Sequence, residues 1–577
     1  MKRFFSLVKI MFIDQYQTRS SLSSEKEKKA RKRTVALYAI LAVCFLPIFV
    51  SIAVAMYYMG QLSQGNIYLG TLLTLVCQGL VLVFGVRAIM SNVFVVNDAD
   101  KLTYLPVRAH TIFLAKLTVA YINEVITSAV AIAVTMLPFG IGSGANFQYY
   151  LMLIPALVLI PMLPMLLGCL VSMPFSALIA RFGKNSAVKT SLRIVTYVLI
   201  MSAYLYGVYS LGLFAGSGSD NFFNNPESFV KDLIVGLDER LAPVMPYFHP
   251  NYMLFSSMLA TSFVSWLVTF TLSLVENALL LGVVFLVSLP FYRKMLTLSL
   301  EDGSANIKRS NSGFRIKNKG IVRELMLTDL KRTARDGQIG FQSFAGIIMM
   351  PVIVIILYFS MGIANEGDYT ILELMNVSPL YQVIAPLMIL AYMTFIGLST
   401  NVLGLYPISR ENKSAYMLKS FPVPFAKILL AKVLLATAVM IVSDFVTCVL
   451  IVALLGVKWY YGIAMLVTMA LLGFGSMCIT TLIDLKDPRL GWENFGQSLS
   501  LRNAKNVWIA MLIGALAVTV IALSSAAFVV WFNLNNDAWY AVLIMWIVIL
   551  GVTTAFAAVS YKVMNGKATK YFEQIEI

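Results

Sequence analysis

The sequence predicts an all-helical protein that crosses a membrane about twelve times, as two pseudo-symmetric halves of six helices. Of its 577 residues, 59% are hydrophobic and 12% are charged, whereas a soluble domain carries roughly 25% charged residues. The mean hydropathy is +0.81. Apolar runs of the ~20 residues that a membrane-spanning helix needs recur along the chain. One motif also occurs in both halves, which indicates that the halves are related.

The repeated motif joins the second and third apolar runs of each half. Residues 102–117 read LTYLPVRAHTIFLAKL and residues 418–433 read LKSFPVPFAKILLAKV. Without a gap, identical residues align at Pro106 and Pro422, Val107 and Val423, Ile112 and Ile428, Leu114 and Leu430, Ala115 and Ala431, and Lys116 and Lys432. Upstream, SNV at 91–93 corresponds to TNV at 400–402. Related halves in a membrane protein favour a pathway or a pair of partner sites at the pseudo-symmetry axis.

The apolar runs define two transmembrane halves, residues 35–292 and 341–561. The runs of the first half lie near 35–59, 67–94, 110–137, 149–180, 190–215 and 262–291. Those of the second half lie near 341–363, 379–406, 424–455, 459–483, 505–532 and 538–561. The first run is long enough to span a bilayer, so we expect a retained helix and not a cleaved signal peptide.

Polar segments flank and join the halves. Residues 1–34 form a basic N-terminal segment, 293–320 a polar linker, and 562–577 a C-terminal tail. Residues 321–340 begin with apolar and basic side chains on different sides of a helix, and 1–19 have the same character. We expect both to be amphipathic helices in the membrane interface. The alternative is a plain basic tail.

Charge predicts the topology. An even number of spans puts both termini on one side, and the lysines and arginines of residues 26–33 mark that side as cytoplasmic. The net charge of +16 follows from the same rule. Because the basic residues are scattered and no base-reading fold accompanies them, the sequence gives no reason to expect nucleic-acid binding.

The predicted outer loop 216–261 contains a partly apolar stretch that is too short to span the membrane and is interrupted by prolines. Such a stretch indicates a re-entrant or surface-lying element. The second half has only the turn 533–537 at the corresponding place, so the halves are unequal.

Ionisable residues inside predicted spans are costly, and each is a candidate functional residue. They are Arg87, Glu124, Glu276 and Asp444. One hypothesis is a polar pathway for substrate, for protons or for a cation. The alternative is internal pairing, for example of Arg87 with Glu124. We interpret Lys116 and Lys432, which lie near the inner interface, as anchors whose ammonium groups extend to the headgroups.

The repeated loop also resembles a known family. Its pattern is D-x-x-x-L-x-x-L-P-V…I-x-x-A-K from Asp98, and E-N-K-S-A-Y-x-L-K-S-x-P-V…I-L-x-A-K from Glu411. Both resemble the permease subunits of ABC-2 type exporters, and above all a bacterial subgroup in which two six-helix halves are fused. The phrase DLKDPRLGWEN at 484–494 is similar to the loop after the fourth span in that subgroup.

The resemblance implies a docking role for the loops. In such exporters an amphipathic helix precedes the first span of each half, and the loop between the second and third spans carries a coupling helix that docks on an ATP-binding subunit. It implies a multi-pass protein of the bacterial cytoplasmic membrane, with two copies of that subunit as partners. The coupling residues carried over are Asp98, Asp100, Leu102, Leu105, Pro106, Glu411, Lys413, Tyr416, Leu418 and Pro422.

The chain has no G-x-x-x-x-G-K-[ST] phosphate loop. We therefore expect no enzymatic activity and no cofactor in this chain, with ATP and Mg²⁺ bound by the partner subunit. The two histidines and five cysteines show no metal-ligand or disulfide spacing. An apolar path suits a lipid, an amphipathic peptide or a hydrophobic drug as substrate.

Two other classes of protein compete with the exporter. An ion-coupled secondary transporter would use Glu124, Glu276 and Asp444, and would interrupt matching helices of both halves. Prolines break the fourth span, but the tenth has none. A membrane enzyme would need clustered acids at one face. The available acids are Asp484, Asp487 and Glu493, and their basic neighbours make a docking loop the better interpretation.

Overall fold

The computed structural model describes residues 2–16, 46, 49–50, 52–63, 66–94, 107–181, 186–210, 249–260, 262–303, 320–363, 379–420, 422–454, 457–488, 490, 492, 505–535 and 538–573. Within these ranges all regular secondary structure is helical. Seven of the helices are long and apolar enough to cross a membrane. Their outer faces carry exposed apolar side chains such as Leu279, which is 65% exposed. The predicted class, a polytopic all-α membrane protein, is confirmed.

The helices of the first half coincide with its second to sixth predicted spans. The first predicted span lies largely outside the described residues. The elements are α1 (Lys2–Tyr16), α3 (Ile67–Ala88), the π-helix η1 (Ile89–Val93), α5 (Ala109–Gly142), α6 (Phe147–Arg181), α7 (Ser186–Ser210), α10 (His249–Leu259) and α11 (Phe263–Gly303).

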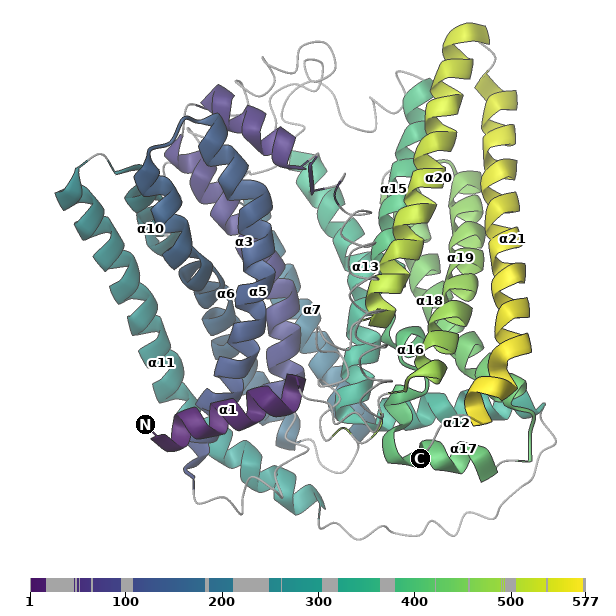
Figure 1. The fold of residues 1–577 in the computed structure, drawn as a ribbon, viewed down its shortest axis with the longest axis horizontal. Helices are drawn as coiled ribbons and strands as arrows, with labels where there is room; N and C mark the ends of the chain where they lie inside the picture. The colour runs from purple at the N-terminus through teal and green to yellow at the C-terminus, as the bar shows by residue number, and fades with distance from the viewer. Residues whose placement is uncertain are drawn as a thin grey trace, which may run out of the picture.

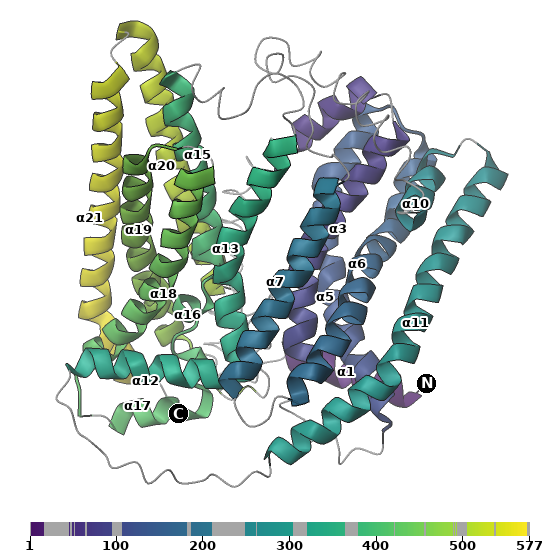
Figure 2. The ribbon, with the colours of Figure 1, turned by 180° about the vertical axis from the view of Figure 1, so that it is seen from behind.

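The second half follows the same order with different interruptions. Its elements are α12 (Ile321–Arg335), α13 (Gly337–Ile363), α15 (Pro379–Thr400), α16 (Val402–Leu405), the 3₁₀-helix η3 (Ser409–Tyr416), α17 (Met417–Ser420), α18 (Phe425–Leu454), α19 (Trp459–Lys486), α20 (Lys505–Asn535) and α21 (Ala538–Glu573). Figures 1 and 2 show two bundles side by side, with α7 and α13 between them.

Short helices gather at one end of the long ones. In Figure 1, α1, α12, α17 and the C-terminal end of α21 all lie at this end, which we call the α12 end. α1 packs against α5, the third span of its half, and α12 packs against α18, the third span of the other half. The two helices predicted to lie in the interface thus occupy equivalent places in the two halves.

Two long helices continue beyond their predicted spans. α11 runs through the first part of the predicted linker to Gly303. Polar residues alone do not terminate a helix, whereas glycine commonly does. α21 is 36 residues long, about 54 Å, and so exceeds the ~30 Å hydrocarbon core. Its extension covers most of the predicted tail, and Met564, Ala568 and Phe572 are buried along one face of it.

The short helix α10 is inserted into the first bundle. It packs against α3, α6 and α11, and Leu254, Phe255 and Met258 are buried. Gly70 permits this approach, since a Cβ at that position would lie 1.8 Å from Cζ of Phe255. Of the two predicted placements, re-entrant or surface-lying, this burial favours the re-entrant one.

A proline in α6 creates a polar contact that holds α10. Pro164 has no N–H, so the carbonyl oxygen of Ile160, four residues earlier, lacks its helical donor. Gln78 of α3 donates its Nε2 to that oxygen at 3.1 Å. The same amide exchanges two hydrogen bonds with Asn251 of α10, at 2.7 and 2.8 Å. A helix break and a buried amide pair therefore join α3, α6 and α10.

The two halves meet where α7 packs against α13. A buried cluster from four helices fills this contact: Leu82 and Val86 of α3, Met90 of η1, Tyr197, Ile200 and Met201 of α7, and Phe341 and Ala345 of α13. The rings of Tyr197 and Phe341 stand edge to face, with centroids 5.9 Å apart, a geometry that aromatic pairs prefer. The first long helix of the second half, α13, is thus packed against the first half.

Candidate docking site at the repeated loop

The second copy of the repeated loop is folded into a compact element at the α12 end. We call residues 406–424 the second-half loop; it contains η3 and α17. Asn401 of the TNV triplet ends α15, with its Nδ2 bonded to the carbonyl of Ala436 at 3.1 Å and its Oδ1 facing the N–H of Gly404 at 3.4 Å. The matching SNV triplet of the first half lies at the π-helix η1. Both second spans are therefore irregular at the same place.

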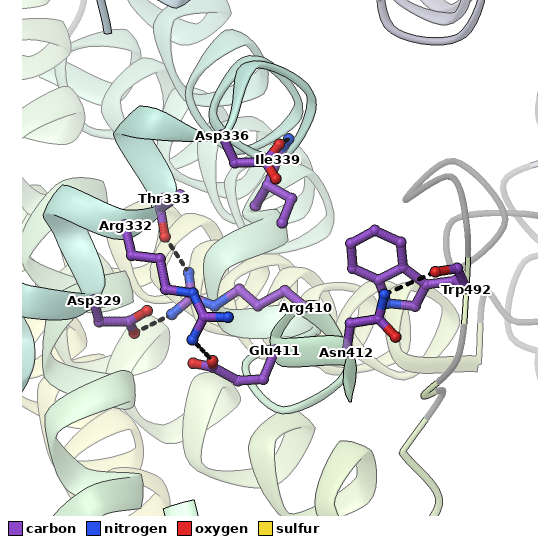
Figure 3. A pocket seen from close by; sticks show the side chains of 9 residues that line it. All are labelled: Asp329, Arg332, Thr333, Asp336, Ile339, Arg410, Glu411, Asn412 and Trp492. Carbon is purple, nitrogen blue, oxygen red and sulfur yellow. Dashed lines mark hydrogen bonds and ion pairs between the residues drawn. The ribbon is translucent and has the colours of Figure 1, made fainter. Parts of the chain in front are cut away.

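A mostly buried group of charges lies behind this loop; of its five side chains, that of Arg332 is 52% exposed. The ion cluster consists of Asp329 and Arg332 from α12, Arg410 and Glu411 from η3, and Lys432 from α18. Lys432 Nζ lies 2.5 Å from Glu411 Oε1 and 3.5 Å from Asp329 Oδ2. Figure 3 shows that Arg410 pairs with Asp329 and that Arg332 pairs with Glu411. Arg332 also donates a hydrogen bond to Ser414. The cluster joins the loop to two helices.

Burial makes these pairings obligatory. The side chains of Lys432 and Glu411 are each 5% exposed, and an unpaired ion in such surroundings would cost several kcal/mol. Burial alone would raise the pKa of Asp329, but Arg410 and Lys432 outweigh it and hold the pKa below its ordinary value. Burial likewise opposes ionisation of Glu411, and Lys432 and Arg332 lower its pKa despite the nearby Asp329. Both carboxyls are therefore ionised at neutral pH.

A second set of contacts fixes the backbone at the start of η3. Asp484, near the end of α19, accepts hydrogen bonds from the N–H groups of Ile408 and Ser409 at 2.7 and 2.9 Å, and from Ser409 Oγ at 2.5 Å. Trp492 donates its indole N–H to the carbonyl of Ser409 at 2.7 Å. The DLKDPRLGWEN phrase thus holds the repeated loop in place.

Asn412 shows how tightly the loop turns. Its φ is 52° and its ψ is −136°, a conformation that non-glycine residues rarely adopt. Its side chain is held by a hydrogen bond from Nδ2 to the carbonyl of Trp492 at 2.7 Å. Strain of this kind persists only where the surroundings determine the backbone, so the contacts from α12, α18 and α19 fix the shape of the loop.

The helical extension of α21 packs against the start of α18 and the end of α19, next to the loop. The rings of Phe572 and Phe425, which opens α18, are stacked with centroids 3.9 Å apart. Lys486 lies over the ring of Tyr571, 5.8 Å from its centroid. The last turns of α21 therefore pack against the first residue after the second-half loop.

A small cavity of about 110 Å³ adjoins the ion cluster. Figure 3 shows its lining, which comes from α12, the corner before α13, η3 and the loop after α19: Asp329, Arg332, Thr333, Asp336, Ile339, Arg410, Glu411, Asn412 and Trp492. A space of this size with polar walls suits a few water molecules, but it is too small for a transported molecule, because ligand pockets measure roughly 300–1,000 Å³.

Comparison with known proteins identifies one family that matches this chain. A family model described as a membrane protein of 12 TMs matches residues 32–558. The chain belongs to this family. A search of the curated proteins finds no match, and a search of the solved structures finds none. The match agrees with the twelve predicted spans, and the description states no activity.

In this twelve-span protein, the predicted coupling residues of the second half divide into two groups. Glu411 and Leu418 are buried, so neither presents its side chain to a partner, and each supports the loop from within. Pro422 is exposed together with Lys419 and Met417, of which Met417 is 49% exposed. The side chains of Lys413 and Tyr416 are outside the described structure. So are the predicted first-half residues Asp98, Asp100, Leu102, Leu105 and Pro106 in full.

The prediction that Lys432 is an interfacial anchor is wrong. Its ammonium group does not extend to the headgroups but lies in the ion cluster, because two carboxylates compensate its charge inside the protein. Lys116, the matching residue, is also buried and 8% exposed. The sequence interpretation missed Asp329, Arg332 and Arg410 as partners. For Asp329 and Arg332 the sequence held a signal, since these opposite charges lie one turn apart on α12.

The structure does not gather the predicted intramembrane charges into one site. Glu124 is on α5 and Asp444 on α18, both are buried, and Oε2 of the first and Oδ2 of the second have no hydrogen-bond partner among the described residues. Glu276 of α11 pairs instead with His249, the first residue of α10, which sequence reasoning did not identify. The side chain of Arg87 is outside the described structure, so its predicted pairing with Glu124 stays a prediction.

Two of the three acids considered for an enzyme have structural partners. Asp484 holds the backbone of η3, as described above, and Asp487 pairs with Lys505 at 2.6 Å. Glu493 lies outside the described residues. The described His, Cys, Asp and Glu side chains include no group of three that could hold a metal ion.

Proposed function

We propose that this twelve-span protein is the permease subunit of an ATP-driven ABC-2 type exporter, which forms the substrate path and docks a separate ATP-binding subunit at the α12 end. The observation that carries the proposal is the attachment of the second-half loop. Buried ion pairs and backbone hydrogen bonds fix it to α12, α18 and α19. A loop that only connected two spans would not need three supports.

Rigid attachment is what a coupling element requires. A partner that pushes on a flexible loop moves the loop alone, whereas a partner that pushes on a packed element moves the helices joined to it. Here the displacement would pass to α18, a membrane-spanning helix, through Lys432 and Glu411. ATP-driven approach of two partner subunits would then tilt one half against the other and open the path to the opposite face.

The exposed residues of α17 and the following turn give the docking surface its chemistry. Met417 offers a flexible apolar side chain, which adapts well to a partner's groove, and Lys419 and Pro422 flank it. Because Glu411 and Leu418 are buried beneath, this surface is held in one shape before the partner arrives. Such preorganisation reduces the ordering cost of binding.

The proposal assigns the chemistry to the partner. Two copies of the ATP-binding subunit would bind ATP and Mg²⁺, and this chain would contribute no cofactor and no catalytic residue. The protein would lie in a bacterial cytoplasmic membrane with both termini in the cytoplasm, which places the α12 end on the inner side. A lipid, an amphipathic peptide or a hydrophobic drug would be its substrate.

The test is gentle purification of the tagged full-length protein from its native host, with mass spectrometry of co-eluting proteins and an ATPase assay. We expect a protein with a phosphate-binding loop to co-elute in stoichiometric amount with the wild type. The same protein should be missing when the Met417→Glu variant is purified. The matched control is Ile321→Glu at the start of α12, where the side chain is 53% exposed. A wild-type protein that elutes alone, or a Met417→Glu protein that keeps its partner, would contradict the proposal.

An ion-coupled secondary transporter is the second candidate, and one observation favours it. Glu124 and Asp444 each hold a buried carboxyl oxygen with no hydrogen-bond partner among the described residues, as residues that bind and release a proton or a cation would. This candidate expects transport that runs on a proton or sodium gradient without any ATPase. Transport should then fail in Glu124→Gln, Glu276→Gln and Asp444→Asn. Transport that needs ATP and survives these substitutions would exclude it.

A further inference from the structure

The corner between α12 and α13 touches both the second-half loop and the first half of the molecule. Asp336 is the residue between the two helices, and its φ and ψ of −79° and 114° turn the chain sharply. Its N–H bonds to the carbonyl of Arg332 at 3.2 Å, which closes α12. Its Oδ1 accepts the N–H of Ile339 at 2.9 Å, which begins α13. The corner is therefore stiff.

On one side, the corner is continuous with the ion cluster. Arg410 donates Nη1 to Thr333 Oγ1 at 3.3 Å, and Asp336 lines the same cavity as Arg332, Arg410 and Glu411 (Figure 3). A displacement of η3 therefore reaches the last turn of α12 through charged contacts that are costly to break.

On the other side, the corner presses against α7 of the first half. A Cβ on Gly340 would lie 2.8 Å from the carbonyl oxygen of Thr333 and 3.0 Å from Cγ2 of Thr190. α7 therefore lies against the backbone of the corner with no room to spare. One turn further along α7, Arg193 interacts electrostatically with Asp336. α7 packs against both α12 and α13.

We propose that Asp336 is a positioning residue that ties Arg193 of the first half to the ion cluster of the second-half loop, so that a displacement of the loop is passed to the contact between the halves. The inference rests on the proposed function only in one respect, namely that a docked ATP-binding partner would displace the loop. The tie itself is a property of this chain alone, and it would make the second-half loop act on α7 as well as on α18.

The tie is tested by hydrogen exchange on the full-length protein in detergent, read in peptides from η3 and from the first two turns of α7. We expect Glu411→Gln to speed exchange in both, by about 100-fold, as is usual when one partner of a buried ion pair is removed. In an Asp336→Asn background the effect should persist in η3 and disappear from α7. Asparagine keeps an oxygen that caps α13 and removes only the charge, so loss of the cap cannot explain that result.

Two further variants sharpen the test. Asp336→Glu keeps the charge and should retain the effect on α7, whereas Arg193→Gln should abolish it. Asp487→Asn breaks the ion pair with Lys505 outside the cluster and should leave α7 unchanged. If Glu411→Gln leaves α7 unaltered, or alters it equally in the Asp336→Asn background, the tie does not exist. Because no partner or substrate is needed, this outcome is independent of the exporter proposal.

Discussion

Three cations and two anions meet behind the second-half loop, and each carboxylate contacts more than one cation. The groups come from α12, η3 and α18, and folding removes all of them from water together except Arg332, whose side chain is half exposed. Burial of Lys432 and Glu411 depends on the opposite charges that the other three side chains of the cluster supply. At the residue scale, the loop is therefore held by an all-or-none set of contacts, and single substitutions should have large effects.

Replacing Lys432 by methionine should destabilise the protein by about 3 kcal/mol, the lower end of the cost of leaving a buried charge without its partner. The measurement is the unfolding midpoint in detergent. Lys427→Met is the matched control, since Lys427 is exposed on the same helix and surface changes usually stay within ~0.5 kcal/mol. Equal midpoints for the two variants would show that the ion cluster contributes nothing.

The cluster also predicts a dependence of stability on pH. In the folded protein the pKa values of Asp329 and Glu411 lie below their ordinary values of about 4. Their contribution is therefore fully present above about pH 5 and is lost as the pH falls through the lowered values. The difference in unfolding midpoint between wild type and Glu411→Gln should narrow below pH 4. A difference that stays constant down to pH 3 would contradict this linkage.

At the scale of elements, the helices of the first half are joined by polar contacts that their own irregularities create. Pro164 frees the carbonyl of Ile160, and that oxygen recruits Gln78, which in turn holds Asn251 of α10. The equivalent helix of the second half, α19, has no proline. The described second half contains no helix inserted like α10, so the proline-rich α6 and the inserted helix belong together.

Gln78→Leu should cost about 2 kcal/mol, because two buried polar groups lose their partner. In a Pro164→Ala background the same substitution should cost about 1 kcal/mol less, since alanine restores the N–H that Ile160 lacks. The measurement is a double-mutant cycle of unfolding midpoints, in which contacting residues show non-additive effects. Additive effects would mean that Gln78 does not serve the carbonyl freed by Pro164.

At the scale of the whole molecule, the described parts of the halves meet mainly where α7 packs against α13, with further contacts of α7 with α12 and of α13 with η1 (Figure 2). Gly340 lies at a close approach of α13 to Thr190 of α7, at the α12 end. A joint near one end of long helices allows a small change there to become a larger displacement at the other end. The contact of α7 with the α12–α13 corner therefore sets how the halves are placed.

Gly340→Ala should push α7 away from the corner, since its Cβ has no space between Thr333 and Thr190. Overpacking of this kind costs typically 1–3 kcal/mol. The measurement is the distance between spin labels at the exposed positions Val195 of α7 and Val442 of α18. Gly282→Ala is the matched control, because no heavy atom lies within 4 Å of its Cβ. Unchanged distances in both variants would show that the corner does not place α7.

The sequence by itself determined the membrane class, the order of the spans and the positions of the repeated loops. It could do so because hydrocarbon demands long apolar helices, and because such runs and a repeated motif are local properties of the chain. It also marked residues 321–340 as an amphipathic helix, of which α12 occupies 321–335. The charged residues inside the spans could also be identified from the sequence, because each interrupts an otherwise apolar run.

The partners of those charges were decided only by the tertiary structure. Lys432 contacts Glu411 and Asp329, which are 21 and 103 positions away in the sequence. No local pattern distinguishes a lysine that extends to the headgroups from one whose charge is compensated inside the protein. The insertion of α10 and the packing of α21 against the start of α18 depend likewise on the packing of distant helices. Compensation of a buried charge is a property of the assembled neighbourhood, and the sequence of one segment does not contain it.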